Sequence, residues 1–134
     1  MTQNLEHAAG GASDEAAVGF GAAEIAYLLS LYEGEAVSTS IEVMGLNAST
    51  SEEFRAAGAS SLLARGFLEA NGDDLEVAGP AAVLGYLLAA AEHWTELGFM
   101  LDSDQAADGA LMLQAPEAVG ILSPRALGTW YLMV

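Results

Sequence analysis

Apolar residues recur at helical spacing in two segments of the chain. The first set is Ile25, Leu28, Leu29 and Tyr32, and the second is Leu84, Leu87, Leu88 and Ala91. Positions i, i+3, i+4 and i+7 lie on one face of an α-helix, so both sets predict amphipathic helices. We expect the first over Ala22–Tyr32, stopped by Gly34, and the second from Pro80, which suits the first turn of a helix.

The segment between these helices carries a strong helix-start signal. Ser49 with Glu52, or Thr50 with Glu53, has the spacing of a capping box, and the predicted helix ends near Arg65. The preceding segment, residues 35–45, fits either a short strand or a short helix, and we favour a short helix or turn.

A short β-hairpin is predicted after this helix. The tight-turn dipeptide Asn71-Gly72 separates Phe67–Glu69 from Leu75–Val77, as in the wing of a winged helix.

The pattern changes after Trp94 to short runs rich in β-forming residues. These runs are residues 96–101, 110–115, 119–122 and 129–134, separated by turn-forming segments. They predict an antiparallel meander of three or four strands. The expected fold class is α+β, with a winged-helix-like helical unit followed by a small antiparallel β-meander packed on helices. We expect a flexible N-terminal tail over residues 1–19 and a single domain over 20–134.

Charge limits the partners that the chain can bind. It has three basic residues, all arginine, against nineteen acidic ones, and its formal net charge is −16. A phosphate-binding surface needs clustered Lys and Arg, so the composition argues against nucleic acid, and an anionic membrane would repel the chain. A basic protein partner would be attracted. Adaptation to a salt-rich environment is a second explanation of the acidity.

The cysteine content, the N-terminus and the apolar stretches of the chain bear on where in the cell the protein is found. The chain has no cysteine, which excludes disulfides and thiolate metal sites. Its N-terminus lacks the basic and apolar regions of a signal peptide, and its longest apolar stretch, residues 81–91, is too short to span a bilayer. We therefore expect a cytoplasmic protein that needs no membrane.

No catalytic or metal-binding motif is complete. His93 and Glu96 would share a face if the preceding helix continued, but zinc needs three or four ligands. The acidic run from Asp102 to Asp108 lacks EF-hand spacing, so an acidic loop is favoured over a weak calcium site. No serine nucleophile motif is present. We therefore expect no enzyme activity, no metal and no cofactor.

The C-terminal run is the candidate partner-binding site. In a strand, Trp130, Leu132 and Val134 would face one way, and Tyr131 and Met133 the other. Both faces are apolar, so the strand is either buried on both sides or presents one side to a partner. Aromatic residues and methionine are enriched at interfaces, and we expect Trp130, Tyr131 and Met133 to make an apolar contact.

The order of predicted elements resembles a known family. The capped helix ends in Leu62–Glu69, of sequence LLARGFLE, and is followed by a hairpin, a helix and an antiparallel meander. Over residues 20–134 this arrangement resembles the N-terminal half of the EspG-type chaperones of type VII (ESX) secretion in actinobacteria. Those proteins are about twice as long. The resemblance implies binding to an exposed hydrophobic helical tip of a secretion substrate.

The sequence thus favours a non-enzymatic, acidic protein-interaction module: an adaptor, chaperone or assembly factor, for which the resemblance implies a link to secretion. Besides a hydrolase or metal-dependent enzyme, two alternatives stay open. One is a winged-helix transcriptional regulator that reads DNA with the helix in Ser51–Arg65. The other is a self-assembling structural protein of a virus or phage. The partner is expected to be a protein or a second copy of the chain.

Overall fold

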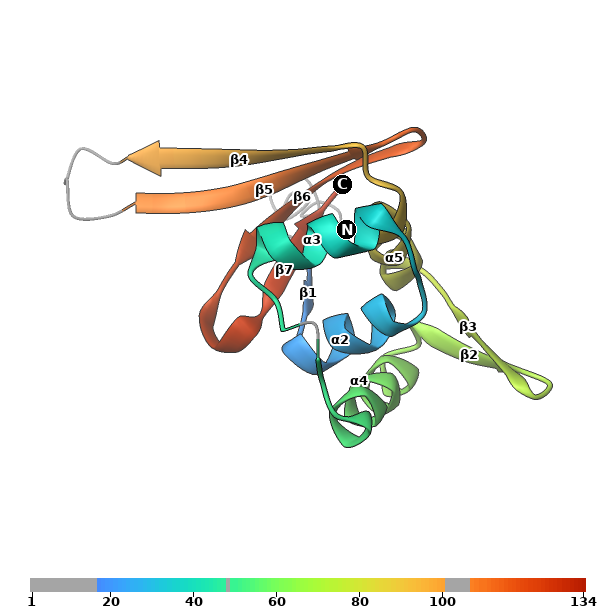
Figure 1. The fold of residues 1–134 in the computed structure, drawn as a ribbon. Helices are drawn as coiled ribbons and strands as arrows, with labels where there is room; N and C mark the ends of the chain where they lie inside the picture. The colour runs from blue at the N-terminus through green and yellow to red at the C-terminus, as the bar shows by residue number, and fades with distance from the viewer. Residues whose placement is uncertain (1–16, 48, 101–106) are drawn as a thin grey trace, which may run out of the picture.

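The computed structural model describes residues 17–47, 49–100 and 107–134, and it has the α+β class expected from the sequence (Figure 1). The helices are α2 (Ala22–Ser30), α3 (Glu35–Met44), α4 (Glu52–Ala64) and α5 (Pro80–Ala90), with a short 3-10 helix, η1, over Ala126–Gly128. The strands are β1 (Ala17–Phe20), β2 (Leu68–Asn71), β3 (Asp74–Val77), β4 (His93–Met100), β5 (Ala107–Ala115), β6 (Ala118–Pro124) and β7 (Trp130–Met133). None of the described helices is long and apolar enough to cross a membrane.

Five strands form one antiparallel sheet in the order β1-β7-β6-β5-β4. The four runs predicted in the C-terminal part form β4 to β7, which confirms the antiparallel meander. The fifth strand, β1, pairs with the C-terminal strand, with Ala17 opposite Met133. Ala17–Gly19 belong to this strand and not to the tail predicted over 1–19, and residues 1–16 lie outside the described residues.

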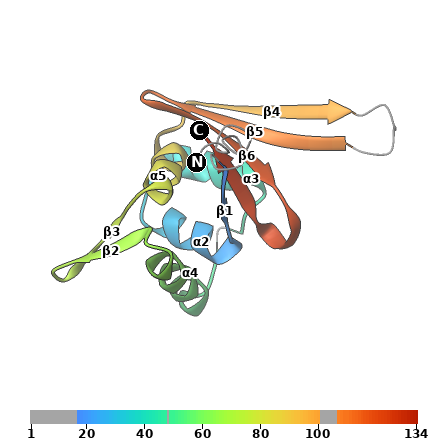
Figure 2. The same ribbon diagram turned by 180° about the vertical axis from the view of Figure 1, so that it is seen from behind.

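The helices lie on one side of this sheet (Figures 1 and 2). Helix α5 packs directly on β5 and β6, and Leu84, Leu87 and Leu88 are fully buried. The approach is close at Gly120, where an added Cβ would lie 2.5 Å from Cδ1 of Leu87. Helices α2 and α4 pack on each other farther from the sheet, and the β2–β3 hairpin projects beside them.

Local sequence signals were confirmed with small shifts. Glu35–Met44 form helix α3, as favoured from the sequence, so three of the described helices precede the hairpin. The N-cap of α4 is Ser51, whose Oγ accepts a hydrogen bond from the Phe54 N–H at 3.1 Å, rather than Ser49 or Thr50. Ser49 instead donates its N–H to Asn47 Oδ1 at 3.0 Å, in the segment that precedes the helix.

The hairpin turn is displaced by one residue. Asn71 pairs with Asp74, so the two-residue loop is Gly72-Asp73 and not Asn71-Gly72. Gly72 has a φ of 67°, a conformation that glycine adopts without steric cost.

A buried serine joins three elements of the core. Ser40 in α3 is fully buried, and its Oγ donates to the carbonyl oxygen of Leu88 at 3.0 Å. That carbonyl is in the last turn of α5, where helix carbonyls lack an intrahelical partner. The same Oγ accepts from Nε1 of Trp94 in β4 at 3.1 Å.

We expect Ser40→Ala to lower the free energy of unfolding by about 1–3 kcal/mol, because it removes the partner of two polar groups in or near the core. Ser38→Ala is the matched control. Ser38 is exposed on the same helix, so its replacement should change stability by less than about 0.5 kcal/mol. Urea denaturation of both variants measures the difference, and equal stabilities would show that Ser40 does not join the elements.

Candidate functional site

No described element covers the sheet face opposite the helices (Figure 2). Strand alternation and the pairing register assign its side chains. The described apolar side chains on this outer face are Ala17, Leu97, Ala110, Met112, Val119, Ile121, Tyr131 and Met133. The polar ones are His93, Thr95, Gln114 and Ser123. We call this surface the outer face.

No described side chain on the outer face is acidic. Asp108, at the far end of the β4–β5 hairpin, lies outside the described side chains. An antiparallel sheet that faces water on one side normally alternates apolar and polar residues, with the polar ones outward. Val119, Tyr131 and Met133 instead keep 40–46% of their surface exposed on the outer face. The chain has nineteen acidic residues, and the described ones lie on other surfaces than this apolar face.

The structure divides the three predicted partner residues between two surfaces. Tyr131 and Met133 lie on the outer face, where they line a hollow of about 450 Å³ with Ala17, Ser123 and the β6–β7 turn. Trp130 is half-buried on the inner face, where it packs against the core. It lines a separate hollow of about 440 Å³ with Val43 of α3. A single surface formed by all three residues is therefore excluded by the alternation of the strand.

Tyr131 also has a structural role within the chain. Its ring lies over Gly19 of β1, where an added Cβ would be 2.8 Å from the ring carbon Cζ. An aromatic side chain that covers a glycine on an edge strand stabilises the strand pair. Met133 and Val119 are therefore better probes of partner binding than Tyr131.

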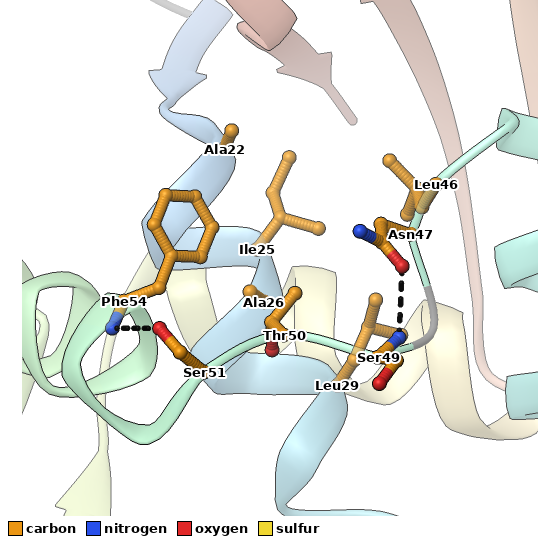
Figure 3. Close-up of a pocket in the computed structure, with 10 residues that line it drawn as sticks. All are labelled: Ala22, Ile25, Ala26, Leu29, Leu46, Asn47, Ser49, Thr50, Ser51 and Phe54. Carbon is orange, nitrogen blue, oxygen red and sulfur yellow. Dashed lines mark hydrogen bonds between the residues drawn. The ribbon is translucent and has the colours of Figure 1, made fainter.

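A third hollow lies on the helical side, between α2 and α4 (Figure 3). It measures about 390 Å³ and lies within the usual size range of ligand pockets. Ile25 and Leu29 of α2, Leu46 of the α3–α4 loop and Phe54 of α4 supply its apolar wall. Its polar rim comes from the loop and the start of α4: Asn47, Ser49, Thr50 and Ser51. We call it the helical groove.

Arg65, the C-cap residue of α4, forms a partly buried ion pair with Glu24 of α2. Nη1 of Arg65 lies 2.8 Å from Oε1 of Glu24, and the guanidinium also stacks near the rings of Phe20 and Phe67. Oε2 of Glu24 accepts from Ser61 Oγ at 2.6 Å. Burial raises the pKa of Glu24, but hydrogen bonds from Ser61, the Gly21 N–H and Arg65 outweigh it, so the pKa lies below its usual value. Because the bonds from Ser61 and Arg65 join α4 to α2, we assign the pair a role in stabilising the fold.

The other two arginines also have acceptors within the chain. Arg55 Nη1 donates to the carbonyl oxygen and the hydroxyl of Thr50, and Arg125 Nη1 donates to the Pro124 carbonyl at 2.8 Å. The three arginines lie on α4, at its C-terminal end and on the β6–β7 turn, so they do not form one basic patch.

The candidate metal ligands do not come together. Residues 93–100 form strand β4 and not a helical extension, so His93 and Glu96 lie on opposite faces of the sheet. Within the described ranges, no three His, Asp or Glu side chains are grouped closely enough to hold a metal ion. Residues 102–106 of the acidic run lie outside the described residues.

The chain matches no protein-family model, and comparison with curated proteins and with solved structures finds no similar protein. The resemblance to EspG-type chaperones and to the winged helix therefore stays a prediction from the sequence.

Sequence reasoning missed most of the outer face. Val119, Ile121 and Met112 were assigned to strands, but their common face follows only from the register between β5 and β6, in which Met112 opposes Ile121. A usable signal was present in the sequence: the runs that form β6 and β7 contain no acidic residue.

Proposed function

We propose that this chain is a non-enzymatic protein-interaction module, an adaptor, chaperone or assembly factor, and that the outer face binds its partner. The observation that carries the proposal is the lack of acidic side chains among the described residues of an exposed apolar sheet face. Contiguous apolar surface of this kind marks interaction sites in soluble proteins. Charged residues are depleted, and methionine and aromatic residues enriched, in the centres of interfaces.

The rest of the surface would direct the partner's approach. The described acids lie on the helices, the turns, the β2–β3 hairpin and the inner side of β4. A partner with an apolar patch ringed by basic residues would match this arrangement, with charge speeding encounter and apolar contact giving affinity. A secretion-associated chaperone that covers an apolar segment of its substrate fits this description. The proposal keeps the cytoplasmic location expected from the sequence.

The rival function, transcriptional regulation, has less support. The hairpin would lie against phosphates in a winged-helix complex, but it presents the exposed side chains of Glu69, Asp73, Asp74 and Glu76. At the end of α4, Arg65 donates hydrogen bonds to Glu24, and Arg55 within α4 donates a hydrogen bond to Thr50. Binding in this pose would bring acids toward phosphates and would release few counterions.

Acidic substitutions on the outer face should abolish capture of the partner. We expect the double variant Val119→Glu/Met133→Glu to lose a partner that the tagged wild-type protein captures from its native host, because each glutamate would be buried without a counter-charge. The readout is quantitative mass spectrometry of the captured proteins.

The matched control is Leu63→Glu/Leu75→Glu, which adds the same charge at residues of similar exposure on the helical side. The control should retain the partner. Loss of the same protein from both variants, or from neither, would contradict a binding site on the outer face.

A further inference from the structure

The β6–β7 turn carries an apolar side chain in an unusual setting. Leu127 is 95% exposed, and its backbone is left-handed, with φ 62° and ψ 33°. This conformation is an outlier for a bulky residue, and such outliers concentrate at functional sites. Hydrophobic contact within the chain does not explain the leucine, because almost none of its surface is buried.

The turn stands at the rim of the helical groove. A Cβ added to Gly128 would lie 3.2 Å from Cβ of Ala22, and Ala22 lines the groove. Figures 1 and 2 both place the turn between β6 and β7 beside the start of α2. A projecting apolar side chain and an apolar hollow therefore lie next to each other on one surface.

The β6–β7 turn and the helical groove carry charges of opposite sign. Arg125 is exposed two residues before Leu127, on the turn. Glu52 and Glu53 are exposed in the first turn of α4, directly before the groove residue Phe54. In a chain with a net charge of −16, most contacts between two copies would bring acid against acid. Contact between the turn of one copy and the groove of another brings arginine toward glutamate.

We propose that the helical groove binds the β6–β7 turn of a second copy of this chain. Leu127 of each copy enters the groove of the other and contacts Ile25, Leu46 and Phe54. Each copy carries both features, so a twofold axis between turn and groove makes both contacts at once, as in most homodimers. Arg125 of one copy then lies against the acidic start of α4 in the other. The turn also borders the outer-face hollow through Arg125 and Ala126, but Leu127 does not line that hollow, so substitution of Leu127 tests the dimer contact separately from partner binding at the outer face.

The first test replaces Leu127 by asparagine, which tolerates the left-handed conformation and removes the apolar side chain. We expect the wild-type protein to dimerise and Leu127→Asn to weaken the dimer by about tenfold or more, because a buried leucine is lost at each of two contacts. Sedimentation velocity over a concentration series measures both. The monomer should remain folded in circular dichroism, since the substitution relieves the backbone.

The second test reverses charges. Arg125→Glu should weaken the dimer, and adding Glu53→Arg should restore it by re-forming an opposite pair across the contact. Arg125→Glu with Glu76→Arg is the control, because Glu76 makes the same charge change on the distant β2–β3 hairpin and should not restore the dimer.

Three results would overturn the proposal. They are a wild-type protein that is monomeric at its highest soluble concentration, a dimer that Leu127→Asn leaves unchanged, and equal recovery with Glu53→Arg and Glu76→Arg.

Discussion

Gly58→Ala is expected to destabilise the protein by about 3 kcal/mol, although alanine is the better helix former by about 1 kcal/mol. Gly58 is buried in the middle of α4, where this helix crosses α2. An added Cβ would lie 1.9 Å from the carbonyl oxygen of Ala23 and 2.9 Å from the Glu24 N–H nitrogen. Backbone atoms cannot rotate away as a side chain can, so the two helices must separate.

Chemical denaturation of Gly58→Ala measures the effect, and Ser60→Ala is the matched control. Ser60 is exposed on the same helix, so alanine there should be neutral or slightly stabilising. A Gly58→Ala variant as stable as the wild-type protein would show that α2 and α4 are farther apart than described.

Glu24→Gln is expected to lower the free energy of unfolding by about 2–3 kcal/mol at neutral pH. The side chain of Glu24 is 5% exposed and accepts from Ser61, Arg65 and the Gly21 N–H. The neutral amide cannot accept all these bonds, and it leaves the Arg65 charge uncompensated. The expected loss lies below the roughly 3–5 kcal/mol expected when a fully buried pair is broken, because Arg65 keeps 36% of its side chain exposed to solvent.

This effect should depend on pH in a defined direction. The pKa of Glu24 lies below its ordinary value of 4.5, so the folded state binds the proton less readily than the unfolded state. The stabilisation by the carboxylate is complete above pH 4.5 and is lost as the pH falls through the lowered pKa. The difference in stability between the wild-type protein and Glu24→Gln should therefore shrink in acid.

Denaturation at a series of pH values from neutral to acidic measures this difference. Glu42→Gln is the control, because Glu42 is exposed on α3 and its replacement should change stability by less than about 0.5 kcal/mol at neutral pH. A Glu24→Gln difference that stays constant, or grows, below pH 4.5 would contradict the account of the ion pair.

The sequence predicted the elements whose signals are local. The apolar stripe of α2, the proline that begins α5 and the glycine of the β2–β3 turn each act within a few residues, and each marks an element that is present. The strand character of residues 119–122 follows from the same kind of signal.

Elements that depend on distant residues were missed. Strand β1 has only four residues, and its pairing partner, β7, lies at the other end of the chain. The buried contacts of Ser40 join residues 48 and 54 positions apart, so no spacing rule predicts them. The outer face was only partly predicted, since alternation separates Tyr131 from Trp130 but does not say which strands lie beside them.

The contact between Arg65 and Glu24 could not be predicted from the sequence either. Arg65 lies in the LLARGFLE stretch, at the end of the segment that the DNA-binding alternative would use, and nothing in that stretch predicts its partner. Its partner Glu24 lies 41 residues earlier, and the close approach of the helices at Gly58 brings the two together. The same approach buries the Glu24 carboxylate against α4.

The claim that the outer face is covered in the cell has a direct test, because the chain has no cysteine. A single cysteine is introduced as Val119→Cys on the outer face, or as Leu75→Cys on the hairpin, where exposure is similar. The rate of alkylation by a membrane-permeant thiol reagent is then compared between intact native-host cells and the purified protein. We predict that Val119→Cys is labelled several-fold more slowly in cells, while Leu75→Cys is labelled equally in both. Equal labelling of Val119→Cys in cells and in the purified protein would contradict partner binding at the outer face.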